Sequence, residues 1–127
     1  MKEELPHPTP AELEILQVLW RRGPSTVRDV FDEMSRSREV AYTTALKMLQ
    51  IMTEKGLVSR EAVGKGHVYT ARLSEETTQR GMVDEFLERA FGGATQKLVL
   101  QAITSKKTTP EELAEIRRLL DSLEDTK

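Results

Sequence analysis

The stretch from residue 40 to residue 72 constrains the fold more than any other part of the sequence. Apolar residues at helical spacing predict an amphipathic helix over Val40–Lys55, and Gly56 marks its end. Two short strands are expected next, at Leu57–Ala62 and Val68–Arg72, as a hairpin. This order predicts a winged helix-turn-helix, in which the helix enters the major groove of DNA and the hairpin, or wing, contacts the flanking backbone.

Two stripes run along the predicted helix. The stripe expected to pack into the core contains Ala41, Ala45, Met48, Leu49 and Met52. The polar stripe carries our candidates for contacts with base edges, Thr43, Thr44 and Lys47. Threonine hydrogen-bonds base edges or touches a thymine methyl group, and lysine donates to guanine acceptors. The alternative is an ordinary solvated helix face.

Residues around this helix are candidates for contacts with the DNA backbone. Lys65 lies at the tip of the wing, within the connection Val63–His67, and Arg60 and His67 are weaker candidates of the same kind. The alternative for Lys65 is a solubilising lysine at a turn. Tyr42 is expected to bond a phosphate through its hydroxyl, unless it is a partly buried tyrosine.

The start of a preceding helix supplies the remaining backbone candidates. Ser25, Thr26 and Arg28 lie where a helix N-terminus can hold a phosphate, and plain helix capping is the alternative. That second helix runs through Met34. A first helix begins at the capping box Thr9–Glu12 and ends at Gly23 and Pro24.

Charge along the chain agrees with a role in DNA binding. The 127 residues carry a net charge of −2, but residues 36–72 hold seven basic and three acidic side chains, a net of +4. Residues 73–127 hold eight basic and 11 acidic side chains, a net of −3. Because the local field steers a polyanion, the helix–hairpin stretch can attract DNA although the whole chain is acidic.

The last third of the chain predicts three more helices, separated at Gly92–Gly93 and restarted by a capping box at Thr109–Glu112. A segment of about 50 residues is too small to bury three apolar faces by itself, so a second copy is the simplest partner. The apolar residues assigned to a dimer interface are Phe86, Phe91, Leu98, Leu100, Leu113, Ile116, Leu120 and Leu123. We therefore expect a mainly α fold with a small β-hairpin wing: a DNA-binding domain at 1–73 and a helical dimerisation domain at 74–127.

Several classes of protein are disfavoured by what the sequence lacks. No cysteine is present, which excludes disulfides, thiolate zinc sites and cysteine nucleophiles. The two histidines, His7 and His67, have no partner at metal-ligand spacing, and no catalytic motif appears, so we expect no metal, no cofactor and no enzymatic activity. No apolar run approaches the roughly 20 residues of a membrane helix, and no signal peptide is recognised, so a cytoplasmic location is expected.

Three segments in order give the chain a family resemblance. They are Pro10–Trp20, then Val40–Ala45 continuing through Lys55–Val58, and finally Ala90–Gly93 followed by Leu98–Leu100. With these segments at that spacing, residues 7 to 123 resemble the BlaI/MecI penicillinase-repressor family of winged-helix transcriptional regulators.

The resemblance implies a homodimer that binds a palindromic double-stranded DNA operator and represses transcription. In the best-known members the genes encode a β-lactamase or a resistant penicillin-binding protein, and a membrane sensor metalloprotease starts induction, with the repressor cleaved in its dimerisation half. Gln101–Ala102 occupies the place of the cut, where those members have Asn and Phe. Ile51 stands where relatives usually carry a basic residue, and Lys47 where many have threonine.

Two other functions are compatible with a winged helix. A ligand-sensing regulator of the multidrug-response type would need a small-molecule pocket between the two halves. In a winged-helix module for protein–protein contact, the polar stripe would not bind DNA. The net charge of +4 over residues 36–72 disfavours this second function.

Overall fold

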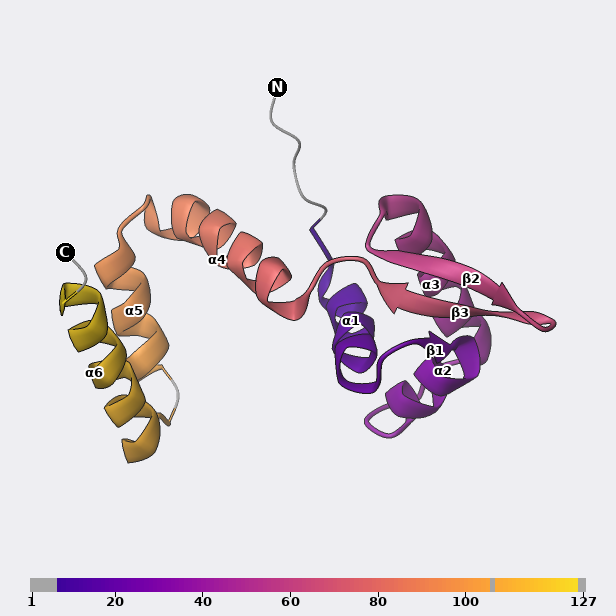
Figure 1. Cartoon of the computed structure of the whole chain (residues 1–127), viewed down its shortest axis with the longest axis horizontal. Coiled ribbons are helices and arrows are strands. Elements are labelled where there is room, and N and C mark those ends of the chain that lie inside the picture. The colour runs from indigo at the N-terminus through magenta and orange to yellow at the C-terminus, as the bar shows by residue number, and fades with distance from the viewer. Residues whose placement is uncertain (1–6, 106, 126–127) are drawn as a thin grey trace, which may run out of the picture. The chain divides into compact units, whose positions relative to one another are not determined.

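The computed structural model describes residues 7–105 and 107–125, and the chain divides into two compact units, Met1–Val83 and Asp84–Lys127 (Figure 1). The first unit holds three helices and a small sheet. The helix α4 (Glu75–Phe91) begins in the first unit, where Thr78 is buried, and continues into the second.

Local capping signals define the first two helices. In α1 (Pro10–Arg22) the Thr9 hydroxyl accepts from the Glu12 amide at 3.2 Å, and Glu12 Oε1 accepts from the Thr9 amide at 2.9 Å. The predicted capping box is therefore confirmed. In α2 (Val27–Ser35) Thr26 and Asp29 make the same reciprocal pair, at 3.1 and 3.0 Å. Each pair satisfies amide groups that the first helical turn leaves without a partner.

The third helix is shorter than predicted. Helix α3 spans Tyr42–Lys55, two residues less than the expected Val40–Lys55, with the extended Ala41 as its N-cap. Ala41 has no side chain that can cap the helix, and Val40 before it packs against the core. The predicted end is confirmed, because Gly56 closes α3 with a φ of 83°, a left-handed conformation that glycine adopts without strain.

The sheet has one strand more than the sequence predicted. Strands β2 (Val58–Val63) and β3 (Gly66–Ala71) form the expected antiparallel hairpin, which projects away from the helices in Figure 1. The two-residue strand β1 (Ser25–Thr26) pairs with β3 on its other side, giving the order β1-β3-β2. The turn at the tip is also tighter than the expected connection Val63–His67, since Val63 pairs with Gly66.

The core lies between the three helices and the root of the sheet. Its fully buried side chains include residues from α1, α2, α3, β2 and β3, among them Ile15, Leu16, Val30, Met34, Leu49, Met52, Val58 and Tyr69. Ala41 was expected on the packed stripe and is exposed instead, because α3 begins after it. The Trp20 indole N–H donates to the Leu73 carbonyl at 3.0 Å, which fixes the chain between β3 and α4 against α1.

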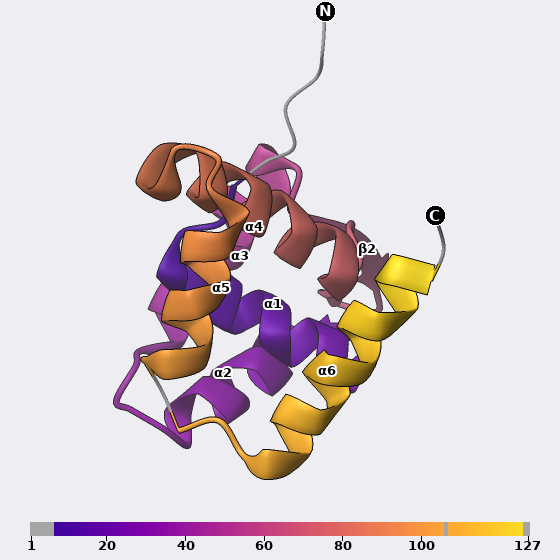
Figure 2. The same ribbon diagram turned by 90° about the vertical axis from the view of Figure 1, so that its left-hand side faces the viewer.

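Helices make up the regular structure of the second unit among its described residues. Gly92 and Gly93, with φ values of 56° and 84°, separate α4 from α5 (Thr95–Thr104), and α6 (Pro110–Asp125) runs antiparallel to α5 (Figures 1 and 2). The predicted capping box of α6 is confirmed by bonds between Thr109 and Glu112. None of the described helices combines the length and the apolar character needed to cross a membrane.

Candidate nucleic-acid interface

Helix α3 presents a polar face to the outside of the molecule. Ala45, Leu49 and Met52 are fully buried and hold the opposite face of the helix against the core. The predicted base contacts Thr43, Thr44 and Lys47 are all exposed. Gln50, Ile51 and Glu54 are exposed on the same side. The structure therefore places the three candidates together on a rigid, accessible surface.

Ion pairing separates the basic residues of the first unit into two groups. Most pair with a carboxylate, including Arg21, Arg22, Arg28, Arg36, Arg38, Lys55 and Arg80. Within residues 7–83, the basic side chains without a carboxylate partner are Lys47, Arg60, Lys65 and Arg72. A cation without a partner can bind a phosphate without first breaking an ion pair. Three of these four were candidates from the sequence, and Arg72 was missed.

A groove of about 260 Å³ lies where the wing meets the starts of α2 and α3. It brings together four of the predicted backbone contacts from four elements, namely Thr26 of β1, Arg28 of α2, Tyr42 of α3 and His67 of β3. Its other lining residues are Val27, Val63, Gly66 and Val68. Sequence reasoning did not select these, because apolar and glycine residues in a hairpin carry no signal for a groove.

Aromatic contacts position the side chains at this groove. The Arg28 guanidinium lies 5.7 Å from the centre of the Phe31 ring, and Phe31 meets Tyr42 edge-on at 5.5 Å. Arg28 also approaches Asp32 at 3.6 Å, in an exposed pair. On the wing, the His67 ring lies 6.3 Å from that of Tyr69. Stacking and edge contacts of this kind limit the rotamers available to both partners.

The start of α2 is engaged in capping. The Ser25 side chain is buried and donates to the Gly23 carbonyl at 2.8 Å, so its hydroxyl does not face the surrounding solvent. The Thr26 amide donates to the Asp29 carboxylate. That bond, together with the positive charge of Arg22, holds the pKa of Asp29 below its ordinary value. The Ser25 hydroxyl and the Thr26 amide therefore both donate to acceptors within the chain and are not available to a phosphate.

A partly buried ion pair fixes the far end of α3. Lys55 Nζ donates to Glu12 Oε1 at 2.7 Å, and the Glu12 side chain is only 8% exposed. Burial alone would raise the pKa of this carboxyl. The hydrogen bonds from Lys55 and Thr9 and the charge of Lys55 outweigh burial, so the pKa lies below its ordinary value.

The residues assigned to a dimer interface are accessible in the second unit. Phe86, Leu100, Leu120 and Leu123 are 55–60% exposed. Phe91, Leu98, Leu113 and Ile116 are half-buried. Phe86 and Phe91 meet edge-on at 5.6 Å. No hydrophobic side chain is buried among the described residues from Asp84 onward, so this unit has no core of its own there.

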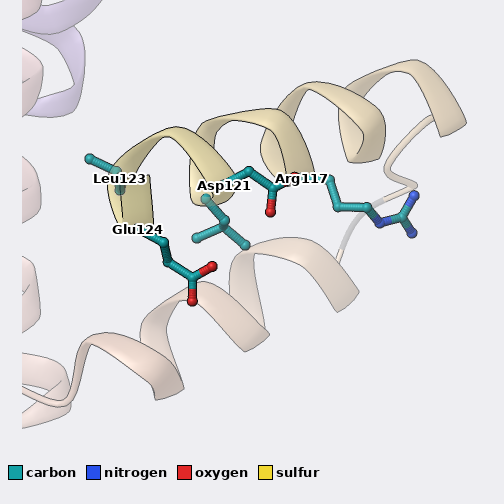
Figure 3. Close-up of a pocket in the computed structure, with 5 residues that line it drawn as sticks. Arg117, Asp121, Leu123 and Glu124 are labelled. Atoms are coloured by element: carbon teal, nitrogen blue, oxygen red, sulfur yellow. The ribbon is translucent and has the colours of Figure 1, made fainter. Parts of the chain in front are cut away.

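The last helix carries a shallow hollow of about 410 Å³. Arg117, Leu120, Asp121, Leu123 and Glu124 line it, and Figure 3 shows Arg117 and Leu123 extending from opposite ends of this stretch of α6. Its lining combines two leucines with three charged residues. Gln101 and Ala102 are both exposed within α5. In the part of the chain that the structure describes, His, Cys, Asp and Glu form no cluster of three or more that could hold a metal ion.

Comparison with known proteins identifies relatives along nearly the whole chain. The family model described as "Penicillinase repressor" matches residues 8–122. The penicillinase repressor of Bacillus licheniformis is 25% identical over 125 residues, covering 98% of each chain. The transcriptional regulator BlaI of Mycobacterium tuberculosis is 30% identical over 115 residues, covering 89% of this chain and 82% of the relative.

A solved structure resembles part of the chain. The solution structure of monomeric B. licheniformis BlaI in complex with the blaP half-operator matches with a TM-score of 0.50 and 29% identity. The match covers 60% of this chain and 92% of that one. The winged-helix fold expected from the sequence is thereby confirmed. The chain belongs to the penicillinase repressor family, whose members are DNA-binding transcriptional repressors and not enzymes.

Proposed function

We propose that this protein is a homodimeric, cytoplasmic repressor that binds a palindromic operator through α3 and the wing. In this proposal residues 1–73 form the DNA-binding domain and residues 74–127 the dimerisation domain. The observation that carries it is that Lys47 and Lys65 are exposed and pair with no carboxylate among the described residues, on the two elements that a winged helix uses to meet DNA. The structure of the related BlaI in complex with a half-operator also supports binding of this protein to operator DNA.

The side chains take different roles in this proposal. Thr43, Thr44 and Lys47 contact base edges, because they lie on the outward face of α3. Lys65 and Arg60 contact phosphates from the wing. Arg28, Tyr42, His67 and the Thr26 hydroxyl surround the groove beside the wing and contact the backbone there.

Dimerisation follows from the exposed apolar residues of the second unit. Burial of apolar surface stabilises by roughly 25 cal/mol per Å², and Leu119, Leu120 and Leu123 of α6 are 55–60% exposed. A two-fold symmetric dimer presents two copies of α3 to one face of the duplex, about 34 Å apart, and so matches a palindromic site.

Derepression in this proposal occurs by proteolysis through a membrane sensor metalloprotease. Gln101 and Ala102 lie within α5, so a protease must first open this helix to reach the bond between them. A cut there separates α4 from α6 and divides the surface that holds two copies together. Repression is lost because each α3 then binds its half-site alone.

A mobility-shift titration against the promoter upstream of the protein's own gene tests the proposal. We expect saturable binding that is much tighter than binding to a random duplex at physiological salt. Lys47→Ala should weaken it, whereas Lys97→Ala, which removes an exposed lysine from α5, should leave it unchanged. Equal affinity for promoter and random DNA would refute the repressor function.

Sedimentation velocity tests the dimer separately. Leu120→Asp and Leu123→Asp place a charge on the apolar face of α6 and should give monomers at micromolar concentration. Ser122→Asp adds the same charge at an exposed polar position of α6 outside the residues assigned to the interface and should leave the dimer intact. A monomeric wild-type protein would contradict this part of the proposal.

A further inference from the structure

Ile51 is a large apolar side chain on the otherwise polar outward face of α3. It is 39% exposed, whereas the buried residues of the same helix, Ala45, Leu49 and Met52, are at 0%. It belongs neither to the core nor to the partly buried residues packed against the core. The exposure of Ile51 therefore has no explanation in the packing of the first unit.

Helical spacing places Ile51 in line with two of the base-contact candidates. Thr44, Lys47 and Ile51 are three and four residues apart, so they form one row along the outward face. The row extends the reading surface by one turn toward the C-terminal end of α3. A duplex that lies along this row contacts Ile51 as well as Thr44 and Lys47.

The surroundings of Ile51 identify the chemistry of its contact. The exposed neighbours Lys47 and Gln50 are polar, so the apolar area is the size of one side chain and not of a protein-binding patch. The positive charge of Lys47 has no partner among the described residues and favours a polyanion over an apolar protein. In the major groove, thymine is the base that presents a methyl group, and apolar side chains read it by direct contact.

We propose that Ile51 contacts the C5-methyl group of a thymine in each half of the operator and so determines specificity at that position. The inference rests on the proposed function. An isoleucine is suited to this contact because its branched side chain is stiff and loses little rotamer freedom when it is covered.

Replacement of each operator thymine by deoxyuridine tests the inference, since it removes only the methyl group. For the wild-type protein we expect one symmetric pair of thymines at which the change weakens binding by about fourfold per half-site. Ile51→Ala should bind the unmodified operator more weakly by a similar factor and should no longer respond to deoxyuridine at that position. Ile51→Val should keep the response, because it retains a branched apolar contact.

The outcomes separate this inference from the function on which it rests. If the wild-type protein binds its operator specifically but responds to deoxyuridine at no position, the role of Ile51 is refuted. The same conclusion follows if Ile51→Ala keeps the full response while its thermal unfolding matches that of the wild type. If the wild-type protein does not distinguish its operator from random DNA, the proposed function fails, and the assignment of Ile51 fails with it.

Discussion

Lys55 Nζ lies 2.7 Å from Glu12 Oε1, and this contact joins the last turn of α3 to the first turn of α1. The same carboxylate oxygen accepts from the Thr9 amide at 2.9 Å. One acidic residue therefore caps a helix and anchors the end of another that lies 43 positions further along the chain. This contact therefore adds to the core packing of Ala45, Leu49 and Met52, which holds the rest of α3.

Lys55→Met should lower the free energy of unfolding of the first unit by about 1–2 kcal/mol. It leaves the Glu12 carboxylate, 8% exposed, without its cation, while the partial exposure of Lys55 keeps the cost below that of a fully buried pair. Urea denaturation followed by the fluorescence of Trp20, which lies in α1, measures the change. Lys47→Met is the matched control, since Lys47 has no partner among the described residues. Equal effects of the two changes would contradict the prediction.

The same pair makes stability depend on pH. The pKa of Glu12 in the folded protein lies below the ordinary value of 4.5, so its ionised form contributes stability above that value. This contribution is lost as the pH falls from 4.5 through the lower folded-state pKa. Glu12→Gln should therefore reduce the loss of stability between about pH 6 and pH 3, measured by urea denaturation at each pH. Asp29, whose pKa is also lowered, should retain part of the dependence.

The two glycines of the wing tip should respond differently to alanine. Gly64 has a φ of 61°, which an alanine adopts only with strain, whereas the φ of Gly66 is not positive. At both positions an added Cβ would have no atom within 4 Å, so only the backbone conformation distinguishes the two substitutions. Gly64→Ala should destabilise the hairpin by about 1–2 kcal/mol, and Gly66→Ala should have little effect. Hydrogen exchange of the amides paired between β2 and β3 measures this as roughly 5- to 30-fold faster opening for Gly64→Ala alone. Similar exchange rates in both variants would show that the turn strain is unimportant.

Lys65→Ala should change the salt dependence of DNA binding. Loss of one phosphate contact lowers the slope of log K against log salt by about one unit and weakens all sequences alike. Lys97→Ala, in the second unit, provides the control with the same change of net charge. A slope that stays the same in Lys65→Ala would mean that the wing tip does not touch a phosphate.

The starts of α1 and α6 could be predicted from the sequence because their causes are local. Thr9 with Glu12, and Thr109 with Glu112, are three residues apart, and each pair forms the bonds expected of a capping box. The end of α3 at Gly56 follows from the same kind of signal, since the glycine adopts a left-handed φ. Such features need no knowledge of the rest of the chain.

Features that depend on distant residues were not predicted. Strand β1 exists because Ser25 lies opposite Tyr69, and two residues contain no periodic pattern from which pairing could be inferred. The burial of Ser25 also results from its pairing with β3. Because this pairing could not be inferred from the sequence, Ser25 was expected to contact the DNA backbone. The groove beside the wing forms because residues from α2, α3 and the wing meet in space. Arg28 and Tyr42 were each predicted to contact the DNA backbone, but the sequence did not indicate that they line one groove.

Strand β1 has a consequence for the energetics of association. Thr26 pairs with Val68 and, in the same residue, caps α2, so the base of the hairpin is continuous with a helix that packs into the core. The half of the wing nearest the core is therefore held in place by β1 and is already ordered in the unbound protein. Less conformational entropy remains to be lost when a ligand covers it, and more of the contact energy appears as affinity.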